Sequence, residues 1–123
     1  MSGRSEETRN RYLAEQSQYD DFNTTRIYDK DWDHVVTSYD HWYILTNLFP
    51  YDNIAQTHDL LVPKRVFGKM SDCTKEEWQE YKTILNQLES DNHYDAILEN
   101  FSKSRSILKH LHLHLIVWKN DSN

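Results

Sequence analysis

The chain has 123 residues and a formal net charge of −6, and aromatic residues make up 13% of it. A chain of this length suits one compact domain, since domains most often contain about 100–150 residues. The many aromatic residues, with only two glycines and two prolines, exclude a disordered or collagen-like protein.

Charge and hydropathy also narrow the choice of partners and compartment. The net negative charge lies in the first half of the chain, because residues 1–60 hold five Lys or Arg against eleven Asp or Glu and residues 61–123 hold nine against nine. This balance disfavours a broad surface for extended nucleic acid. No apolar run reaches the roughly 20 residues that span a bilayer, and the N-terminus is polar rather than signal-like. We therefore expect a cytoplasmic protein that binds neither a membrane nor extended nucleic acid.

The first predicted element is a helix near the N-terminus. Residues Glu6–Tyr19 are rich in helix-forming side chains but carry only a weak apolar stripe. We therefore assign residues 1–20 to an N-terminal helical extension and residues 21–123 to a single domain.

Short apolar runs indicate strands before and after a stronger helix. Trp42–Leu45 and Leu60–Val62 are aromatic or aliphatic runs that end close to prolines. Tyr94–Glu99 is a further strand candidate, and Lys109–Trp118 is another, with strict alternation in its middle. These runs predict one sheet of about five strands.

The segment between these strands carries the clearest helix signals. Thr74 and Glu77 have the spacing of a capping box, and apolar residues then recur at spacings of three and four from Trp78 to Leu88. This pattern predicts one main helix over about residues 75–90. Strands with one main helix indicate an α+β fold with an antiparallel sheet.

Three histidines at alternate positions are the chemically distinctive feature of the last strand. In a strand, His110, His112 and His114 share one face, and the intervening leucines share the other. The leucine face can pack against the main helix. Three aligned imidazoles are hard to explain by packing, because aliphatic side chains would fill a core without needing hydrogen-bond partners.

Two kinds of chemistry fit such a face. Histidines at alternate positions can share a zinc ion, with His58 as a third ligand. However, the outer two histidines lie roughly 13 Å apart at the backbone, which strains a site that uses all three. The other chemistry is phosphoryl transfer, in which a neutral imidazole nitrogen attacks phosphorus and its neighbours stabilise the developing charge. His112, in the middle, is best placed to attack.

The run His110–Ile116 resembles the signature of the histidine triad (HIT) superfamily, in which three histidines alternate with apolar residues. The stretches Asn47–Asp52 and His58–Arg65 are similar to the strand pair that lies upstream of the signature in that family. Together the blocks cover about Trp42–Trp118, in the expected order and with the helix between them.

The resemblance implies the HIT-like fold and the chemistry of dinucleoside polyphosphate hydrolases and nucleoside phosphoramidases. A mononucleotide would lie in a cleft, and His112 would attack its α-phosphorus to form a nucleotidyl-histidine intermediate, without an obligatory metal. His110, His114 and His58 would support phosphate binding and departure of the leaving group. Family members commonly pair, so a homodimer is the default expectation.

The resemblance also suggests two polar contacts to the nucleotide. Asn47 would contact the ribose and Ser106 the phosphate or the leaving group. Each residue also has a local explanation, because Asn47 precedes a proline-containing turn and Ser106 suits an exposed position.

The chain departs from the family pattern at three places. Val66 stands where many relatives carry a second histidine, and the glycines and glutamine that often precede the histidine strand are missing. The segment between Asn47 and His58 is a few residues longer than usual, with Asp52–Thr57 as its expected loop. Three basic residues precede the histidines, namely Lys103, Arg105 and Lys109. If they contact a polyphosphate, their charge compensates for the phosphate contacts that the missing glycines would supply.

These departures keep alternatives to the enzyme open. The first alternative is a nucleotide-binding module whose catalysis has decayed. The second is a zinc-binding protein that uses the histidine strand and His58.

Overall fold

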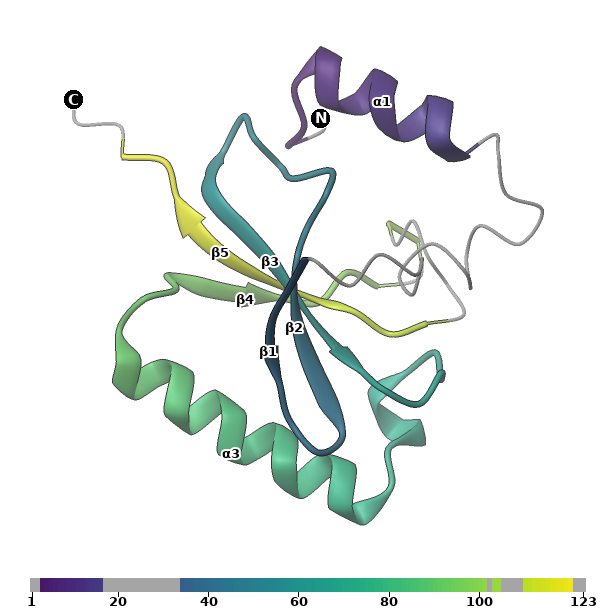
Figure 1. Cartoon of the computed structure of the whole chain (residues 1–123), viewed down its shortest axis with the longest axis vertical. Helices are drawn as coiled ribbons and strands as arrows, with labels where there is room; N and C mark the ends of the chain where they lie inside the picture. The colour runs from purple at the N-terminus through teal and green to yellow at the C-terminus, as the bar shows by residue number, and fades with distance from the viewer. Residues whose placement is uncertain (1–2, 17–33, 102, 105–109, 121–123) are drawn as a thin grey trace.

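The computed structural model describes residues 3–16, 34–101, 103–104 and 110–120. Five antiparallel strands form one sheet, in the spatial order β1-β2-β3-β5-β4 (Figure 1). In chain order they are β1 (Val35–Ser38), β2 (Trp42–Thr46), β3 (Ala55–Pro63), β4 (Ala96–Leu98) and β5 (Leu113–Trp118). The predicted α+β fold with an antiparallel sheet is confirmed.

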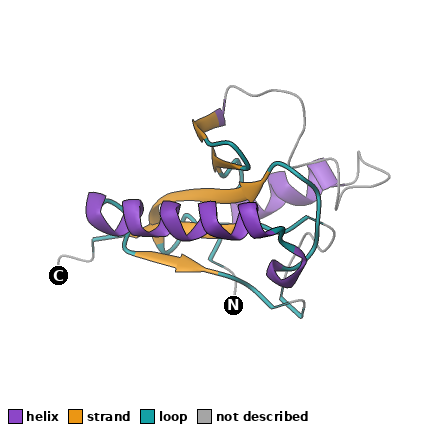
Figure 2. Ribbon diagram, turned by 90° about the horizontal axis from the view of Figure 1, so that it is seen from below, coloured by secondary structure: helices purple, strands orange, loops and turns teal. Residues whose placement is uncertain are grey.

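In the described part of the chain, two α-helices and a short 3-10 helix accompany the sheet. They are α1 (Glu6–Gln16), the 3-10 helix η2 (Met70–Asp72) and α3 (Lys75–Asp91). Helix α3 extends along one face of the sheet, as Figure 2 shows. Helices α1 and α3 lie at opposite ends of the molecule in the view of Figure 1. No helix among the described residues is long and apolar enough to cross a membrane.

The ends of α3 follow from its sequence. The Thr74 hydroxyl accepts a hydrogen bond from the Glu77 amide over 3.1 Å, and the Glu77 carboxylate accepts one from the Thr74 amide over 2.7 Å. This capping box satisfies two amides that the first helical turn leaves without partners. The helix ends at Asp91, and the C-cap residue Asn92 has a left-handed φ of 57°, which stops the helical hydrogen bonding.

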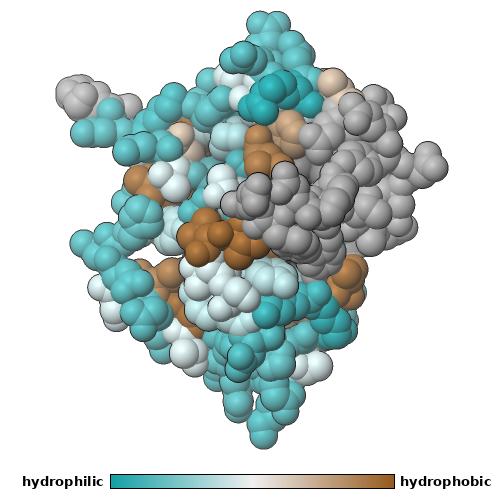
Figure 3. All heavy atoms as spheres, viewed as in Figure 1, coloured by the Kyte–Doolittle hydropathy of each residue, from teal (hydrophilic) through white to brown (hydrophobic). Residues whose placement is uncertain are grey.

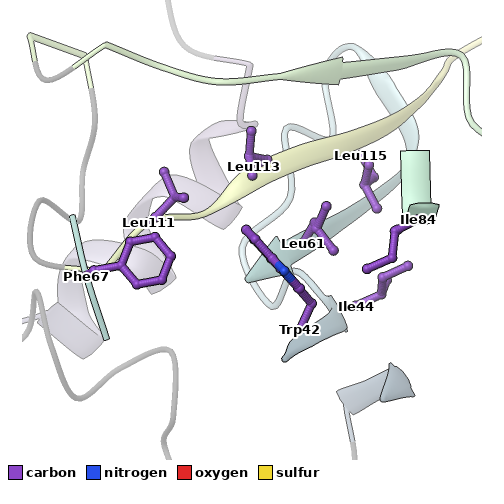
Figure 4. Packing of buried hydrophobic residues seen from close by; sticks show 8 residues of the cluster. All are labelled: Trp42, Ile44, Leu61, Phe67, Ile84, Leu111, Leu113 and Leu115. Atoms are coloured by element: carbon purple, nitrogen blue, oxygen red, sulfur yellow. The ribbon is translucent and has the colours of Figure 1, made fainter. Parts of the chain in front are cut away.

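The main core lies between α3 and the sheet. Alternate strand residues face the helix, and they pack around Trp42 and Ile84 (Figure 4). The eight residues of this cluster are Trp42, Ile44, Leu61, Phe67, Ile84, Leu111, Leu113 and Leu115. Each buried aliphatic side chain contributes about 2 kcal/mol by transfer from water. The predicted packing of the leucine face against the main helix is confirmed.

Strand boundaries differ from the predicted ones in several places. Strand β1 was not predicted from sequence, because only alternate residues of this short edge strand are shielded from solvent. Strand β3 begins at Ala55, so the expected loop over Asp52–Thr57 is wrong for its last three residues. Strand β4 is shorter than Tyr94–Glu99. The part of the predicted N-terminal helix beyond Gln16 lies outside the described residues.

The last strand also starts later than predicted. Strand β5 begins at Leu113 rather than at Lys109, which itself lies outside the described residues. The reason is that the Leu111 amide donates to the Phe67 carbonyl over 2.7 Å instead of joining the ladder with β3. His110 and His112 therefore precede the strand, and only His114 belongs to it.

The surface is largely hydrophilic on the face drawn in Figure 3, with small hydrophobic patches near its centre. Several large apolar side chains are substantially exposed among the described residues, including Val36, Leu48 and Phe101. They lie in different parts of the chain, and such scattered exposure is normal for a folded domain.

Candidate functional site

The two central strands bring His58 and His114 together. In the β3–β5 ladder, Leu60 pairs with His114 and His58 pairs with Ile116, so the two histidines are diagonal neighbours on one face. This face is opposite to the one that α3 covers, because the alternate residues Leu61 and Leu113 belong to the core under the helix. His58 Nε2 lies 2.7 Å from His114 Nδ1. Both side chains are buried.

A backbone amide determines which nitrogen of His58 carries the proton. The Tyr51 N–H donates to His58 Nδ1 over 2.9 Å, so Nδ1 is an acceptor and the proton is on Nε2. Nε2–H therefore donates to His114 Nδ1. It follows that neutral His114 carries its own proton on Nε2.

His112 is oriented by its own backbone. Its Nδ1 lies 3.0 Å from the carbonyl oxygen of His110, which can only accept, so Nδ1 carries the proton. The lone pair is then on Nε2. The rings of His112 and His114 meet edge to face, with centroids 5.3 Å apart. A buried imidazole with a directed lone pair beside imidazole N–H donors is suited to attack an electrophile.

The ring of His110 is held by the end of β3. Its ring is fully buried, and Nε2–H donates to the Pro63 carbonyl over 3.0 Å. Burial lowers its pKa, an effect that the bond to Pro63 partly opposes. His110 thus fixes the segment before β5 to the end of β3, and its predicted support of the phosphate stays a prediction.

Asn47 lies against His58. The Asn47 amide donates to the His58 carbonyl over 3.1 Å, and the Asn47 side-chain oxygen accepts from the Phe49 amide over 2.9 Å. The side-chain Nδ2 lies 3.3 Å from both ring nitrogens of His58, which places it over the ring. Asn47 thus connects the Phe49 backbone to His58, and its predicted contact to ribose stays a prediction.

Tyr51 is a site residue that sequence reasoning missed. Its ring stacks on His114 with centroids 5.2 Å apart and an interplanar angle of 24°, and lies 4.5 Å from the ring of His58. The Asn100 Nδ2 is 3.3 Å from His114 Nε2 and 3.2 Å from the Tyr51 hydroxyl. Since His114 Nε2 carries a proton, we infer that the Asn100 amide turns its oxygen to this nitrogen. Neither residue has a sequence signature.

The N-terminal segment is anchored beside Tyr51. Arg4 Nε donates to the Phe49 carbonyl over 2.7 Å, and its guanidinium lies over the rings of Tyr12 and Tyr51, at 4.6 and 5.2 Å from their centroids. Its positive charge lowers the pKa values of both His58 and His114. The N-terminal extension is thus in contact with the residues that hold the histidines.

Asp52 makes a second anchor for the same segment. Its carboxylate accepts hydrogen bonds from the Ser5 amide and hydroxyl and from the Thr8 hydroxyl. Burial raises its pKa, but these bonds outweigh that effect and lower it to about 2. Gly3 approaches so closely that a Cβ on it would lie 2.7 Å from the Cβ of Tyr51.

Burial and positive charge keep the histidine pair neutral. Burial, Arg4 and His112 lower the pKa of His58 to about 4. Burial and electrostatic repulsion, from His112 and His58 when they are protonated and from Arg4, lower the pKa of His114 to about 2. Both imidazoles are therefore neutral near pH 7.

The structure leaves several other predicted site residues untested. Ser106 and Lys109 lie outside the described residues, as does Arg105, and Lys103 is exposed. Val66 is 43% exposed. Within residues 3–16, 34–101, 103–104 and 110–120, no three His, Cys, Asp or Glu side chains are grouped so that they could hold a metal ion.

Comparisons with known proteins identify the family and the fold. The family model described as HIT domain matches residues 30–121. A HIT family hydrolase from Legionella pneumophila Philadelphia 1 has a similar fold, with a TM-score of 0.54 and 19% identity over 71% of this chain and 82% of that one. A histidine triad protein from Clostridium difficile gives a TM-score of 0.52 and 23% identity over 72% and 82% of the two chains. No curated protein matches the chain.

Proposed function

Because the chain belongs to the HIT domain family, we propose that it is a nucleotide hydrolase or nucleotidyl transferase with His112 as its nucleophile. The observation that carries the proposal is the bond from His112 Nδ1 to the His110 carbonyl. Because this bond holds the proton on Nδ1, the neutral form of the ring carries its lone pair on Nε2, as a nitrogen nucleophile needs.

In the proposed reaction, His112 Nε2 attacks the α-phosphorus of a nucleotide conjugate. The Nε2–P bond forms while the bond from phosphorus to the leaving group breaks, and its electron pair departs with the leaving group. Water or another acceptor then attacks the nucleotidyl-histidine and gives up a proton. Cleavage of the N–P bond restores neutral His112 and releases the nucleoside monophosphate derivative.

The neighbouring groups have proposed roles in the same step. His114 is proposed to stabilise charge on the phosphate oxygens or leaving group through its Nε2–H, and His58 to support it through the bond from His58 Nε2–H to His114 Nδ1. His110 supports the site because its ring bonds to the Pro63 carbonyl at the end of β3. Asn47 is proposed to contact the ribose. Ser106 and Lys109 are proposed to contact the phosphate chain.

The direct test is hydrolysis of a small panel of conjugates by wild type and by His112→Ala, with a chelator present. We expect wild-type turnover of at least one substrate and a loss of at least about 1,000-fold in kcat in the variant. His93→Ala, at an exposed position after α3, is the matched control and should retain the wild-type rate. Equal turnover by His112→Ala and wild type would refute the proposal.

A second candidate is a nucleotide-binding module without turnover. It is favoured by Val66, which places no imidazole where many relatives have one. It predicts that folded wild type binds a mononucleotide but releases no product. Retained turnover in the chelator, lost in His112→Ala, would exclude both this candidate and the zinc-dependent alternative.

A further inference from the structure

Arg4 places a positive charge beside the histidine pair. Its guanidinium lies over the ring of Tyr51, 5.2 Å from the centroid, and that ring stacks on His114 at 5.2 Å and lies 4.5 Å from the ring of His58. Arg4 and Tyr51 are only partly buried, so a ligand can reach both from solvent. The guanidinium is therefore separated from the two buried imidazoles by one aromatic ring.

Hydrogen bonds on both sides of Arg4 hold it at this place. The Asn53 amide donates to the Gly3 carbonyl over 2.7 Å, and Asn53 Nδ2 donates to the Arg4 carbonyl over 2.9 Å. The amide and the hydroxyl of Ser5 donate to the carboxylate of Asp52. The main chain around Arg4 is thus bonded to the loop between β2 and β3, which fixes where the guanidinium lies.

Anchoring alone does not explain why this residue is charged. The Phe49 carbonyl, which accepts the bond from Arg4 Nε, would accept one from a neutral N–H donor as well. The charge of Arg4 lowers the pKa values of both His58 and His114, so its field extends into the site. Both imidazoles are neutral near pH 7 and donate hydrogen bonds without supplying net charge. Arg4 thus adds a fixed positive charge to a pair that has none of its own.

An anionic ligand of this protein needs such a local charge. The chain has a formal net charge of −6, which repels a phosphate at long range. A guanidinium keeps its positive charge at any pH at which the protein is folded. Arg4 precedes residues 30–121, which match the HIT domain model, so this charge is an addition to the matched domain.

We propose that Arg4 is a phosphate-binding residue of the histidine site, and that the N-terminal segment supplies through it the positive charge that attracts the phosphate of the nucleotide. The inference rests on the proposed function, whose ligand it takes over. The charge of Arg4 acts on the ligand, whereas its bond to Phe49 and its contact with Tyr51 hold it in place.

NMR titration of the ¹⁵N-labelled protein with adenosine monophosphate and with adenosine tests this role. The two probes differ only in the phosphate, so adenosine reports whether the rest of the site is intact. We expect Arg4→Gln to weaken the binding of adenosine monophosphate by at least about 10-fold and that of adenosine by less than about twofold. Arg9→Gln, at an exposed position of α1, makes the same change in charge and should keep the wild-type affinity for both.

Arg4→Lys separates charge from position. Lysine keeps the charge but lacks the Nε–H that bonds to Phe49, so its affinity for adenosine monophosphate should stay within about threefold of the wild-type value. Added salt should reduce the difference between wild type and Arg4→Gln, because it screens a charge that is partly exposed.

Two results would overturn the inference while leaving the proposed function intact. One is wild-type affinity for adenosine monophosphate in Arg4→Gln. The other is an equal loss in Arg4→Lys and Arg4→Gln, or an equal loss for adenosine, which would show that Arg4 only holds the loop. If folded wild type does not bind adenosine monophosphate, both the inference and the proposed function fail.

Discussion

His58 and His114 are buried without charge, which makes the stability of the protein depend on pH. Their pKa values in the folded state are about 4 and about 2. In the unfolded chain each histidine returns to about 6.5. As the pH falls below this value, protons bind the unfolded state and not the folded state, so the free energy of unfolding decreases.

His114→Gln tests this linkage with a side chain that cannot titrate. Between pH 7 and pH 5, one such histidine accounts for a loss of about 2 kcal/mol in the free energy of unfolding. We therefore expect the variant to lose about that much less than wild type over the same range in urea unfolding. His93→Gln, at an exposed position, should keep the wild-type slope. An unchanged slope in His114→Gln would contradict the assigned pKa.

At the scale of residues, the sequence predictions rested on side-chain type, and the catalytic and binding roles that they assign stay predictions. The alternating histidines pointed to His112 and His114, and the upstream block His58–Arg65 pointed to His58. Tyr51 could not be found in this way, because it holds His58 through its backbone amide. The carbonyl that orients His112 was out of reach for the same reason.

At the level of elements, the capping box is the best-defined local determinant. Thr74→Ala removes the acceptor of the Glu77 amide at the start of α3. The expected result is a loss of about 1 kcal/mol in the free energy of unfolding, measured by denaturant titration. Thr83→Ala is the control, because Thr83 is exposed in the helix interior and alanine has the higher helix propensity. Equal effects of the two substitutions would show that the cap contributes nothing specific.

The elements differed in how well their sequences predicted them. Helix α3 was predicted closely, since capping and apolar periodicity both mark it. Strand β1 left little signal, because it is short and half exposed at the edge of the sheet. The start of β5 was misplaced because alternation continues through His110 and His112, whereas the Leu111 amide bonds to Phe67. Such a non-local backbone contact has no sequence pattern.

Across the whole molecule, the N-terminal extension and the histidine site meet at one loop. Helix α1 has a weak apolar stripe, and it is held instead by Arg4, by the Asp52 carboxylate and by the edge-to-face contact of Tyr12 with Phe49. The hydrogen bonds of Arg4 and Asp52 join residues 44 to 47 positions apart in sequence. The sequence therefore predicted the helix but not where it docks.

Gly3→Ala tests this docking. The added Cβ would lie 2.7 Å from the Tyr51 Cβ and 2.8 Å from its Cγ, so the segment or the tyrosine must shift. We expect the free energy of unfolding to fall by about 1–3 kcal/mol, together with faster amide exchange in α1. Asn10→Ala, on the exposed side of α1, should change stability by less than about 0.5 kcal/mol. Unchanged exchange in Gly3→Ala would contradict the close approach.

The bond from the Tyr51 amide to His58 also determines which mutations this site can tolerate. Every amino acid except proline supplies the same backbone N–H. The ring of Tyr51 can therefore be exchanged during evolution while the proton on His58 stays on Nε2, provided that the loop keeps its path. A site oriented by the main chain can thus keep its protonation pattern in homologues whose loop sequences have diverged.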